Sequence, residues 1–322
     1  MTLVELRYIV ALARERHFGR AAEACYVSQP TLSVAVKKLE EQLGVTLFER
    51  RGTETKSGSV RAVSITPIGE QIVAQAERVL AEAARINEIA TQGKDPLAGP
   101  LRLGVIYTIA PYLLPKLVPL LRSAAPQMPL IVQENFTGRL VEQVRAGDLD
   151  LIIVALPLNL PSLMEREVYD EAFRVLIPAA HPWVQQTRIK PAWLLDEPLL
   201  LLGAGNCFRD QVLDLCARTG NSGVSGVSFS NPNSPHILEG SSLETIRYMV
   251  ASGIGITVMP ATAADLIPAG DPLLCVRPFV EPTPTRCVGL VWRSSYPRQP
   301  VVDIVRQAMI DCRLPGTEET IC

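Results

Sequence analysis

The first fifty residues repeat apolar side chains at the spacing of short amphipathic helices. Apolar positions from Leu3 to Leu12 predict a first helix that ends near Arg14. A second short helix is predicted at residues 19–25, where alanines permit close helix packing. A third is predicted at residues 29–43, after a serine suited to cap it. Its buried face is formed by apolar residues spaced by four, three and four, namely Leu32, Val36, Leu39 and Leu43.

The opposite side of this third helix is polar and carries lysines. Short polar side chains suit the edges of DNA bases, a methyl-bearing side chain suits thymine, and lysines suit phosphates. Two short strands are predicted next, at 47–51 and 62–66, joined by a hairpin rich in Gly, Ser, Thr and Lys. The pattern predicts a winged helix-turn-helix that binds double-stranded DNA. The candidate DNA-binding residues are Gln29, Pro30, Thr31, Ser33, Val34, Lys37 and Lys38 on the helix, with Arg50 and Arg51 on the wing.

The distribution of charge agrees with this interpretation without establishing it. The chain has a formal net charge of -2, but residues 1–66 contain ten Lys and Arg against seven Asp and Glu. The remainder contains 21 against 26. A basic head on an acidic body fits a DNA-binding protein. The alternative is a small helical domain whose lysines are only solvated.

A heptad pattern follows the head along residues 67–93. Apolar residues recur at spacings of four and three, the period with which two helices pack along their length. At about 1.5 Å per residue, residues 68–90 would span roughly 35 Å. We therefore expect a linker helix that joins two chains into a homodimer, instead of a helix that faces only solvent. Its expected contact residues are Ile72, Ala76, Val79, Ala83 and Ile86.

From residue 101 onward, short apolar strands alternate with helices, which predicts an α/β body. Residues 94–100, with two prolines and a glycine, predict a hinge before it. The strands are expected at residues 101–105, 130–136, 149–155, 175–178, 199–202 and 286–292. The helices are expected at residues 111–124, 140–146, 207–218, 243–252 and 301–312.

The composition argues against several other classes of protein. The apolar runs fall short of the ~20 residues that a membrane span needs, and residues 1–20 lack the apolar core of a secretory signal. We therefore expect a cytoplasmic protein that does not bind membranes. No phosphate loop, nucleotide fingerprint or Ser/His/Asp order is present, and the three histidines have no metal-ligand spacing with cysteine. We expect no enzymatic activity, no cofactor and no metal.

Two of the seven cysteines, Cys207 and Cys216, lie in the most informative segment of the body. In a reducing compartment, a disulfide is more often transient than structural. Asn206 is suited to cap a helix whose first turn holds Cys207. The positive end of that helix and the nearby Arg209 favour a reactive thiolate. Peroxide oxidises such a thiolate to a sulfenic acid, which condenses with a second thiol.

The spacing of the pair has a mechanical consequence. Nine residues on an intact helix place two side chains on opposite faces, about 13.5 Å apart along the axis. A disulfide tolerates a Cα separation of only roughly 4.4–6.8 Å. The two sulfurs can join only if the segment unwinds or bends, which would make it a two-state switch. The alternative is that both cysteines are small, inert core residues.

Several motifs of the head resemble the signature of LysR-type transcriptional regulators over about residues 2–72. They are the segments 18–24 (FGRAAEA), 27–33 (VSQPTLS), 38–40 (KLE), 43–44 (LG) and 47–50 (LFER). The resemblance implies a Rossmann-like α/β sensor of two lobes, similar to periplasmic binding proteins, with a small-molecule site in the cleft. The implied boundaries are 1–66 for the winged helix-turn-helix, 67–93 for the linker helix, 94–100 for the hinge, 101–172 with 276–322 for lobe I, and 173–275 for lobe II.

The body resembles the peroxide-sensing branch of this family through about residue 312. The similarity is carried by the segments 104–106 (GVI), 111–115 (PYLLP), 207–211 (CFRDQ) and 284–291 (PTRCVGLV). It implies that Cys207 reacts with hydrogen peroxide and that Cys216 then forms a disulfide with it. The implied pocket and thiolate-supporting residues are Thr108, Thr137, Asn206, Arg209, Asp210 and Arg286. The cysteines that match no essential redox role are Cys25, Cys275, Cys287, Cys312 and Cys322.

Three features depart from the family pattern. The residue before the reactive cysteine is usually His, but here it is Asn206, which can cap a helix and cannot shuttle a proton. A slower reaction with peroxide is therefore expected. The wing segment 52–60 and the loop 224–239 are longer than usual. The longer wing puts its phosphate contacts in question. The longer loop puts in question the distance over which the cysteine segment refolds.

The resemblance implies an activator of transcription that responds to hydrogen peroxide. Its implied target genes encode antioxidant enzymes such as catalase and alkyl hydroperoxide reductase. RNA polymerase is an expected partner, and dimers are expected to pair into homotetramers. Two alternatives stay open at this point. One is a LysR-type regulator that binds an organic effector and has inert cysteines; the other is a thiol peroxidase or solute-binding protein that carries a helical head.

Overall fold

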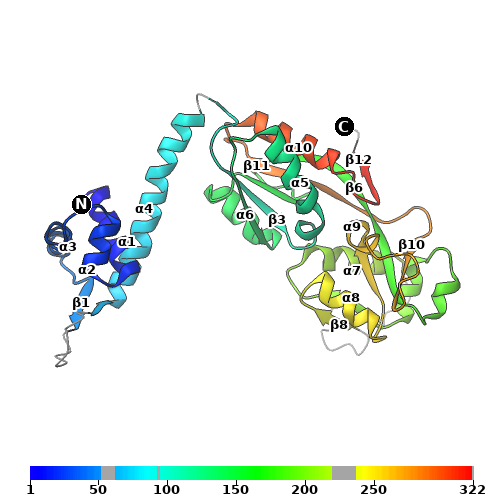
Figure 1. Ribbon diagram of the computed structural model, residues 1–322. Helices are drawn as coiled ribbons and strands as arrows, with labels where there is room; N and C mark the ends of the chain where they lie inside the picture. Colours follow the sequence, from blue (N-terminus) through cyan, green and yellow to red (C-terminus); the bar gives the residue numbers. More distant parts are fainter. Residues whose placement is uncertain (52–61, 93–94, 220–236, 321–322) are drawn as a thin grey trace. The chain divides into compact units, whose positions relative to one another are not determined.

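The structure is a computed structural model, shown in Figure 1, that describes residues 1–51, 62–92, 95–219 and 237–320. The chain divides into two compact units, Met1–Lys94 and Asp95–Cys322. No helix in the described ranges combines the length and apolar character needed to cross a bilayer.

Three helices and a hairpin open the first unit. They are α1 (Leu3–Glu15), α2 (Phe18–Ala24) and α3 (Gln29–Leu43), followed by the antiparallel strands β1 (Phe48–Arg51) and β2 (Ala62–Ile65). Ser28 caps α3, because its Oγ accepts a hydrogen bond from the backbone N–H of Thr31 at 3.3 Å. Gly44, at φ +70°, ends the same helix in the left-handed conformation that glycine adopts readily.

The predicted apolar faces of these helices meet in one small core. Its fully buried side chains include Ile9, Leu12, Leu32 and Leu39. The carboxylate of Glu40 joins α3 to the hairpin, because its Oε1 accepts hydrogen bonds from the backbone N–H groups of residues 47 and 48 at 2.7 and 3.0 Å. The outer side of α3 is therefore held in a fixed orientation relative to the hairpin.

Helix α4 (Pro67–Gln92) completes the first unit and corrects one part of the predicted dimer seam. Ala76 is only 3% exposed and belongs to the core of its own unit, against which Ile72 also packs. The first turns of α4 thus cover α1 in a single chain. Val79 and Ile86, which are 36% and 68% exposed, are the predicted seam residues that remain available to a second chain.

The second unit begins with a parallel sheet. Strand β3 (Leu101–Ile106) lies between β4 (Leu130–Asn135) and β5 (Leu151–Leu156). Helix α5 (Ala110–Ala124) joins β3 to β4, and α6 (Thr137–Ala146) joins β4 to β5. Crossovers of this kind are right-handed, and these two run in opposite directions because β4 and β5 lie on opposite sides of β3. The two helices therefore cover opposite faces of the sheet.

The end of the chain completes this sheet. Helix α10 (Gln299–Asp311) lies beside α5, as Figure 1 shows. Strand β11 (Thr285–Arg293) pairs antiparallel with β5, and β12 (Thr317–Glu319) pairs with β6 (Leu163–Pro178). The apolar side chains between these layers form the larger of the two cores of this unit.

One long strand, β6, belongs to both halves of the second unit. Up to Ala172 it pairs with β11, and from Phe173 onward it pairs with β9 (Thr257–Pro260) and β10 (Leu274–Pro278). The sequence pattern indicated only residues 175–178 of this strand. The earlier residues alternate with Glu, Arg and Asp, since their outer face is only partly covered, and they lack a continuous apolar run.

The half beyond Phe173 has its own core. Around that core lie the strands β7 (Leu199–Leu202) and β8 (Ile237–Gly240), the helices α7 (Cys207–Thr219), α8 (Leu243–Ala251) and α9 (Ala261–Ala264), and the short 3-10 helices Pro182–Gln185 and Pro191–Asp196. β7 and β8 are parallel neighbours, and α7 leaves the end of β7. The inner side of α7 buries Phe208, Val212 and Cys216.

The exposed apolar residues of α4 yield a prediction about assembly. Ile86→Asp should weaken homodimerisation by at least about tenfold, because an unpaired charge would be buried in the seam. Sedimentation equilibrium of the full chain measures the change. Ala74→Asp is a matched control, since it adds the same charge to an exposed position about 140° around the helix from Val79. Equal association of both variants and the unaltered chain would contradict the heptad interpretation.

Candidate functional site

A small cavity lies in the second unit beside the first residue of α7. Its wall is formed by three segments that are distant in sequence, residues 106–108, 135–137 and 205–207. The volume open to the centre of a water-sized molecule is about 10 Å³. One buried water needs about 10–15 Å³ by this measure. The space in contact with Cys207 is therefore about the size of one water molecule.

Strand ends and helix starts meet at this cavity. The parallel strands β3 and β4 end at the same edge of the sheet, where ligand sites of α/β proteins commonly lie. Helix α6 begins at Thr137 and α7 begins at Cys207, and both residues line the cavity. The unpaired N–H groups and the dipole of a first helical turn favour negative charge. The wall thus suits a thiolate and other small anions.

Two threonine hydroxyls line the cavity with hydrogen-bonding capacity left for a guest. Thr108 is buried, and its Oγ1 accepts a hydrogen bond from Nη1 of Arg286 at 2.9 Å. Its own proton remains for another acceptor. Oγ1 of Thr137 is buried and has no hydrogen-bond partner within the described residues. Because an unsatisfied buried polar atom is costly, both hydroxyls are suited to bind a small polar molecule.

Arg286 is fully buried and is held by groups from several elements. Its Nε and Nη2 both lie 2.7 Å from Oε2 of Glu171, its neighbour across β11 and β6. Its Nη1 and Nη2 donate to Oγ1 and to the carbonyl of Thr108 at 2.9 and 3.1 Å. The buried positive charge is therefore neutralised and linked to the cavity through Thr108.

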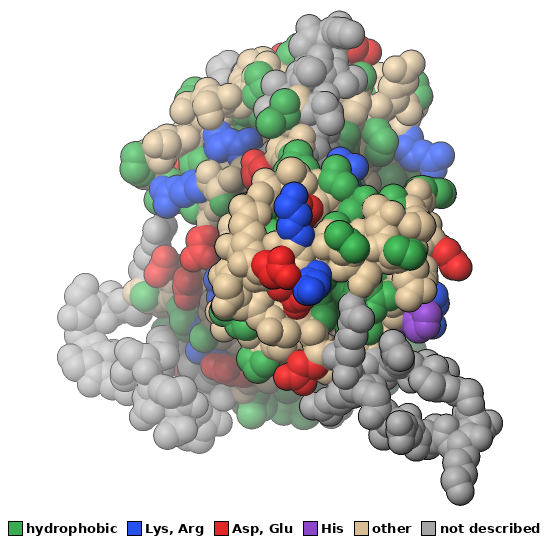
Figure 2. All heavy atoms as spheres, turned by 90° about the vertical axis from the view of Figure 1, so that its left-hand side faces the viewer, with side chains coloured by type: hydrophobic (Ala, Val, Ile, Leu, Met, Phe, Trp, Pro, Cys, Tyr) green, Lys and Arg blue, Asp and Glu red, His purple; other side chains and the backbone are tan. Residues whose placement is uncertain are grey.

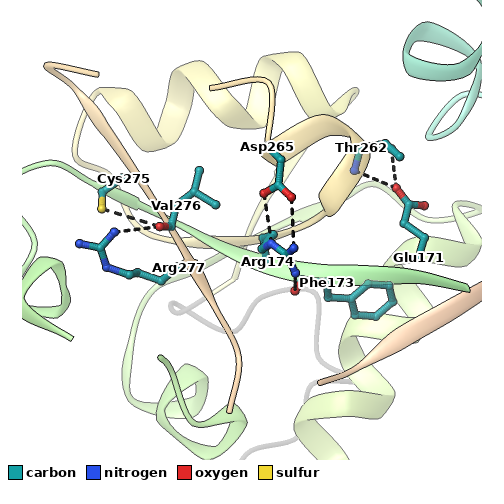
Figure 3. A network of polar contacts seen from close by, with 8 residues as sticks. All are labelled: Glu171, Phe173, Arg174, Thr262, Asp265, Cys275, Val276 and Arg277. Atoms are coloured by element: carbon teal, nitrogen blue, oxygen red, sulfur yellow. Dashed lines mark hydrogen bonds and ion pairs between the residues drawn. The ribbon is translucent and has the colours of Figure 1, made fainter. Parts of the chain in front are cut away.

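Glu171 also ties the two halves of the unit together. Its Oε1 accepts hydrogen bonds from the backbone N–H of Thr262, at 3.0 Å, and from the hydroxyl of the same residue (Figure 3). A few residues along β6, Arg174 forms a second pair, with Asp265, through two hydrogen bonds of 3.1 Å. That second pair is partly exposed, whereas Glu171 and Arg286 are buried.

The first turn of α7 is attached to this ion pair through Phe208. Cζ of Arg286 lies 5.2 Å from the centre of the Phe208 ring, within the range of a cation–π contact. The same ring packs edge to face against Phe173, with 5.1 Å between centroids. Because Phe208 follows Cys207 directly, any movement of the start of α7 disturbs the surroundings of Arg286.

Both candidate redox cysteines lie on α7. Cys207 is its first residue and is partly exposed, whereas Cys216 is buried in the adjacent core. No disulfide joins the described cysteines. Nine residues of continuous helix separate the pair by about 13.5 Å along the axis, against the roughly 4.4–6.8 Å that a disulfide allows between Cα atoms. The two sulfurs can bond only after α7 loses its helical conformation.

Burial raises the pKa of the Cys216 thiol to about 11. A protonated thiol is a weak nucleophile, and at neutral pH Cys216 is protonated while α7 is intact. The protonation of Cys216 and the separation of the two sulfurs on α7 therefore lead to the same order of events. The helix must open before Cys216 can react.

The three remaining candidate residues near Cys207 have separate positions. Asn206 is buried, and its Nδ2 donates to the carbonyl of Gly203 at 2.8 Å, which fixes the loop leading into α7. Arg209 was expected to support the thiolate. Its Nη1 instead donates to the carbonyl of Leu202 at 2.8 Å and lies 2.7 Å from Oε1 of Glu239, so its charge is directed to β7 and β8. Asp210 is exposed.

The predicted DNA-binding side of α3 is open to solvent. Six of its candidate residues are exposed and Ser33 is partly exposed; the six are Gln29, Pro30, Thr31, Val34, Lys37 and Lys38. Tyr26, in the turn before α3, is 96% exposed at φ +57° and was not singled out by sequence reasoning. In Figure 2 the Lys and Arg side chains on the viewed face are scattered among hydrophobic and uncharged ones, and some lie next to Asp or Glu.

Other predicted features fall partly or wholly outside the described structure. The wing segment 52–60 and residues 224–236 of the long loop lie outside the described residues. Arg50 and Arg51 lie on β1, but their side chains are outside the description as well. Their predicted contacts with phosphate stay predictions.

Sequence reasoning missed the residues that surround the reactive segment. Glu171 and Thr262 belong to no recognised motif, and Phe208 was given no role beyond its place in the segment 207–211. Tyr107 and Phe136, which line the cavity, would read as ordinary strand-end residues. An aromatic that directly follows a strand and directly precedes a motif threonine, as in Tyr107-Thr108 and Phe136-Thr137, was the available signal.

Two family models match the chain. One describes the LysR substrate binding domain and matches residues 94–311, and the other describes a bacterial regulatory helix-turn-helix protein of the lysR family and matches residues 3–70. Among curated relatives, the "Hydrogen peroxide-inducible genes activator" of Dickeya chrysanthemi is 37% identical over 313 residues, which are 96% of this chain and 96% of the relative.

Solved structures of OxyR are similar over nearly the whole chain. A cysteine-to-aspartate variant of full-length OxyR from Pseudomonas aeruginosa is 49% identical, with a TM-score of 0.61, and the match covers 96% of this chain and 99% of that one. A hydrogen-peroxide-bound, cysteine-to-serine variant of OxyR from Corynebacterium glutamicum is 33% identical, with a TM-score of 0.63, covering 97% and 92%. These findings confirm the resemblance indicated by the motifs of the head and body.

The buried ion pair predicts a large loss of stability when one partner is neutralised. Glu171→Gln leaves the Arg286 guanidinium buried without a counter-charge and should lower the free energy of unfolding by about 3–5 kcal/mol. Urea unfolding measures the change. Asp265→Asn removes the carboxylate partner of Arg174, a partly exposed residue of the same strand β6, and should cost less, about 1 kcal/mol or below after solvent screening. Equal losses would contradict the assigned burial.

The raised pKa of Cys216 predicts a pH-dependent stability. The unfolded thiol, with an ordinary pKa of 9.0, ionises before the folded one, so the folded state holds an extra proton between about pH 9 and 11. The stabilisation is complete below pH 9 and decreases as pH rises through this window, by about 2–3 kcal/mol in all. Urea unfolding of the unaltered chain and of Cys216→Ala at several pH values isolates this contribution. Parallel pH profiles would contradict it.

Proposed function

The chain belongs to the LysR family of bacterial transcriptional regulators, and we propose that it binds promoter DNA and senses hydrogen peroxide through Cys207. The observation that carries the proposal is the small cavity bounded by Cys207, Thr108 and Thr137. It brings an accessible thiol, two hydroxyls and the positive ends of two helices around a space fit for a very small guest. The names of the similar proteins agree with this ligand.

The reaction follows from these groups. The Cys207 thiolate attacks one oxygen of hydrogen peroxide, an S–O bond forms, the O–O bond breaks, and hydroxide leaves and takes up a proton to become water. Sulfur is oxidised to a sulfenic acid and peroxide is reduced. Thr108 and Thr137 orient the peroxide by hydrogen bonds, and the helix termini stabilise the leaving hydroxide. Asn206 offers no titrating group to deliver the proton, so the proton comes from an acid in the surrounding solution.

The disulfide is formed in a second step. The Cys216 sulfur attacks the sulfenic sulfur of Cys207, an S–S bond replaces the S–O bond, and water leaves. Because the intact helix keeps the sulfurs apart and Cys216 protonated, α7 unwinds for this step. The unwound segment withdraws Phe208 from Arg286, and the covalent bond then selects a second packing of this part of the sensor.

The size of the cavity favours peroxide over an organic effector. A drug-sized or metabolite-sized ligand needs a pocket of roughly 300–1,000 Å³. The larger hollows among the described residues, including an apolar one between α5 and β4, contain neither Cys207 nor the two threonines in their lining. The alternative of an organic effector in the cleft, with inert cysteines, therefore has less support.

The remaining assignments rest on the family. We assign DNA contact to the exposed side of α3 and to the wing, and homodimerisation to the exposed apolar residues of α4. The lobes of the sensor, residues 101–172 with 276–322 and residues 173–275, carry the redox site between them. Paired dimers forming a tetramer, contact with RNA polymerase, a cytoplasmic location and control of catalase and alkyl hydroperoxide reductase genes complete the proposal. It involves no cofactor, metal or enzymatic turnover.

Peptide mapping after oxidation tests the proposal. Treatment of the full chain with hydrogen peroxide in mild excess should create one intramolecular disulfide between Cys207 and Cys216. Hydrogen exchange should show lost protection of α7 backbone amides after oxidation, because the helix opens. A DNA footprint should change with the same dose of peroxide.

Two variants serve as comparison. Cys207→Ser should abolish both the disulfide and the change of footprint, whereas Cys275→Ser, a cysteine outside the proposed pair, should preserve them. A chain in which Cys207 stays reduced, or in which Cys207→Ser responds normally, would overturn peroxide sensing. A disulfide formed with full protection of α7 would overturn the unwinding step alone.

A further inference from the structure

Two aromatic side chains stand at the rim of the Cys207 cavity. Tyr107 follows β3 and Phe136 follows β4, and both line the cavity. Each is also substantially exposed, 43% for Tyr107 and 39% for Phe136. A side chain that both lines a cavity and reaches solvent lies on the route from the solvent to the cavity. Any molecule that reaches the thiol from this side passes these two rings.

The rings contact each other and brace the loop before Cys207. Their centroids are 5.3 Å apart with an interplanar angle of 75°, an edge-to-face arrangement that stabilises aromatic pairs. A Cβ placed on Gly205 would lie 3.8 Å from Cδ1 of Phe136, so the ring of Phe136 lies against that loop. At φ +92°, Gly205 is in a conformation that residues with side chains rarely adopt. The rim is thus formed by three contacting segments, which end in Tyr107, Phe136 and Gly205.

The geometry points to Tyr107 and Phe136 as an aromatic gate that admits hydrogen peroxide and rejects bulkier hydroperoxides. This inference rests on the proposed reaction at Cys207 and concerns which peroxides take part in it. The thiol chemistry itself does not discriminate. For an alkyl hydroperoxide the thiolate attacks the terminal oxygen, the O–O bond breaks, and an alkoxide leaves and takes a proton to become an alcohol. Selection must therefore come from access to the sulfur.

The dimensions of the site support a steric filter. The volume open to the centre of a water-sized molecule is only about 10 Å³, so the bulk of a tert-butyl group has to be accommodated at the rim, where the two rings lie. Misfit of a single methylene group costs about 10- to 200-fold in selectivity in known pockets. Truncation of either ring leaves space that the neighbouring chain fills only in part. Removal of a ring should therefore admit alkyl groups.

The test compares two oxidants on the same thiol of the full chain. Rate constants for Cys207 oxidation by tert-butyl hydroperoxide and by hydrogen peroxide are measured by trapping the sulfenic acid in a Cys216→Ser background. The readout is their ratio, in which any general change of thiol reactivity cancels. Tyr107→Ala and Phe136→Ala should each raise the ratio by about tenfold or more. Tyr107→Phe, which keeps the ring, should retain the original ratio.

A distant aromatic serves as the matched control. Tyr248→Ala removes an exposed ring from α8 and should leave the ratio unchanged. An unchanged ratio in both Tyr107→Ala and Phe136→Ala would overturn the gate, as would equal gains in Tyr107→Ala and Tyr107→Phe. If hydrogen peroxide does not oxidise Cys207 in the original chain, the proposed function fails instead, and the two failures are thereby distinguished.

Discussion

A guanidinium group that is fully buried must have its charge neutralised and its donors occupied, and this requirement organises the sensor around Arg286. Its carboxylate partner comes from β6, its hydroxyl and carbonyl partners come from Thr108 after β3, and its aromatic neighbour comes from α7. The group itself belongs to β11. Four elements must therefore be correctly placed before this one charge is stable inside the protein. The cavity beside Cys207 shares two of these elements, the end of β3 and the start of α7, and its third wall comes from the end of β4 and the start of α6.

The relation between this charge and α7 makes the site sensitive. Cys207 and Phe208 are adjacent, so the residue proposed to be oxidised is next to a residue that covers the guanidinium. A helix cannot be unwound at its first turn without moving both. The core around Cys216 loses packing as well, because that thiol is buried among apolar side chains. The reduced state thus combines a buried ion pair with a helix whose first turn packs through Phe208 on Arg286 and Phe173, and which buries the Cys216 thiol farther along.

The sequence predicted the parts that depend on local pattern. The three head helices, the linker helix and α7 were found within a few residues, since their apolar spacing and caps lie in one stretch of chain. Most of β6 was missed because charged residues on its open side interrupt the apolar alternation. Ala76 was assigned to the dimer because a heptad pattern does not reveal which of two partners a face meets, and α1 covers it.

The site shows the same division between local and distant information. Cys207, Thr108 and Thr137 were predicted from motifs, and the structure brings all three to one cavity. Arg209 was assigned by its nearness in sequence, yet the chain carries Glu239 into its reach from 30 residues away. Glu171, Thr262 and the aromatic pair of Tyr107 and Phe136 became visible only through pairings across the sheet or between its two ends. No local pattern encodes such pairings.

The continuity of β6 limits how the sensor can transmit a signal. In binding proteins whose lobes are joined by flexible crossings, a ligand draws the lobes together by hinge rotation. Here β6 runs without interruption from one lobe into the other, paired with β11 up to Ala172 and with β9 and β10 from Phe173 onward. The two lobes are thus joined by a strand that is hydrogen-bonded on both sides of the junction. The duration of the response is then governed by the lifetime of a covalent bond and the supply of a reductant, and not by how fast an effector dissociates.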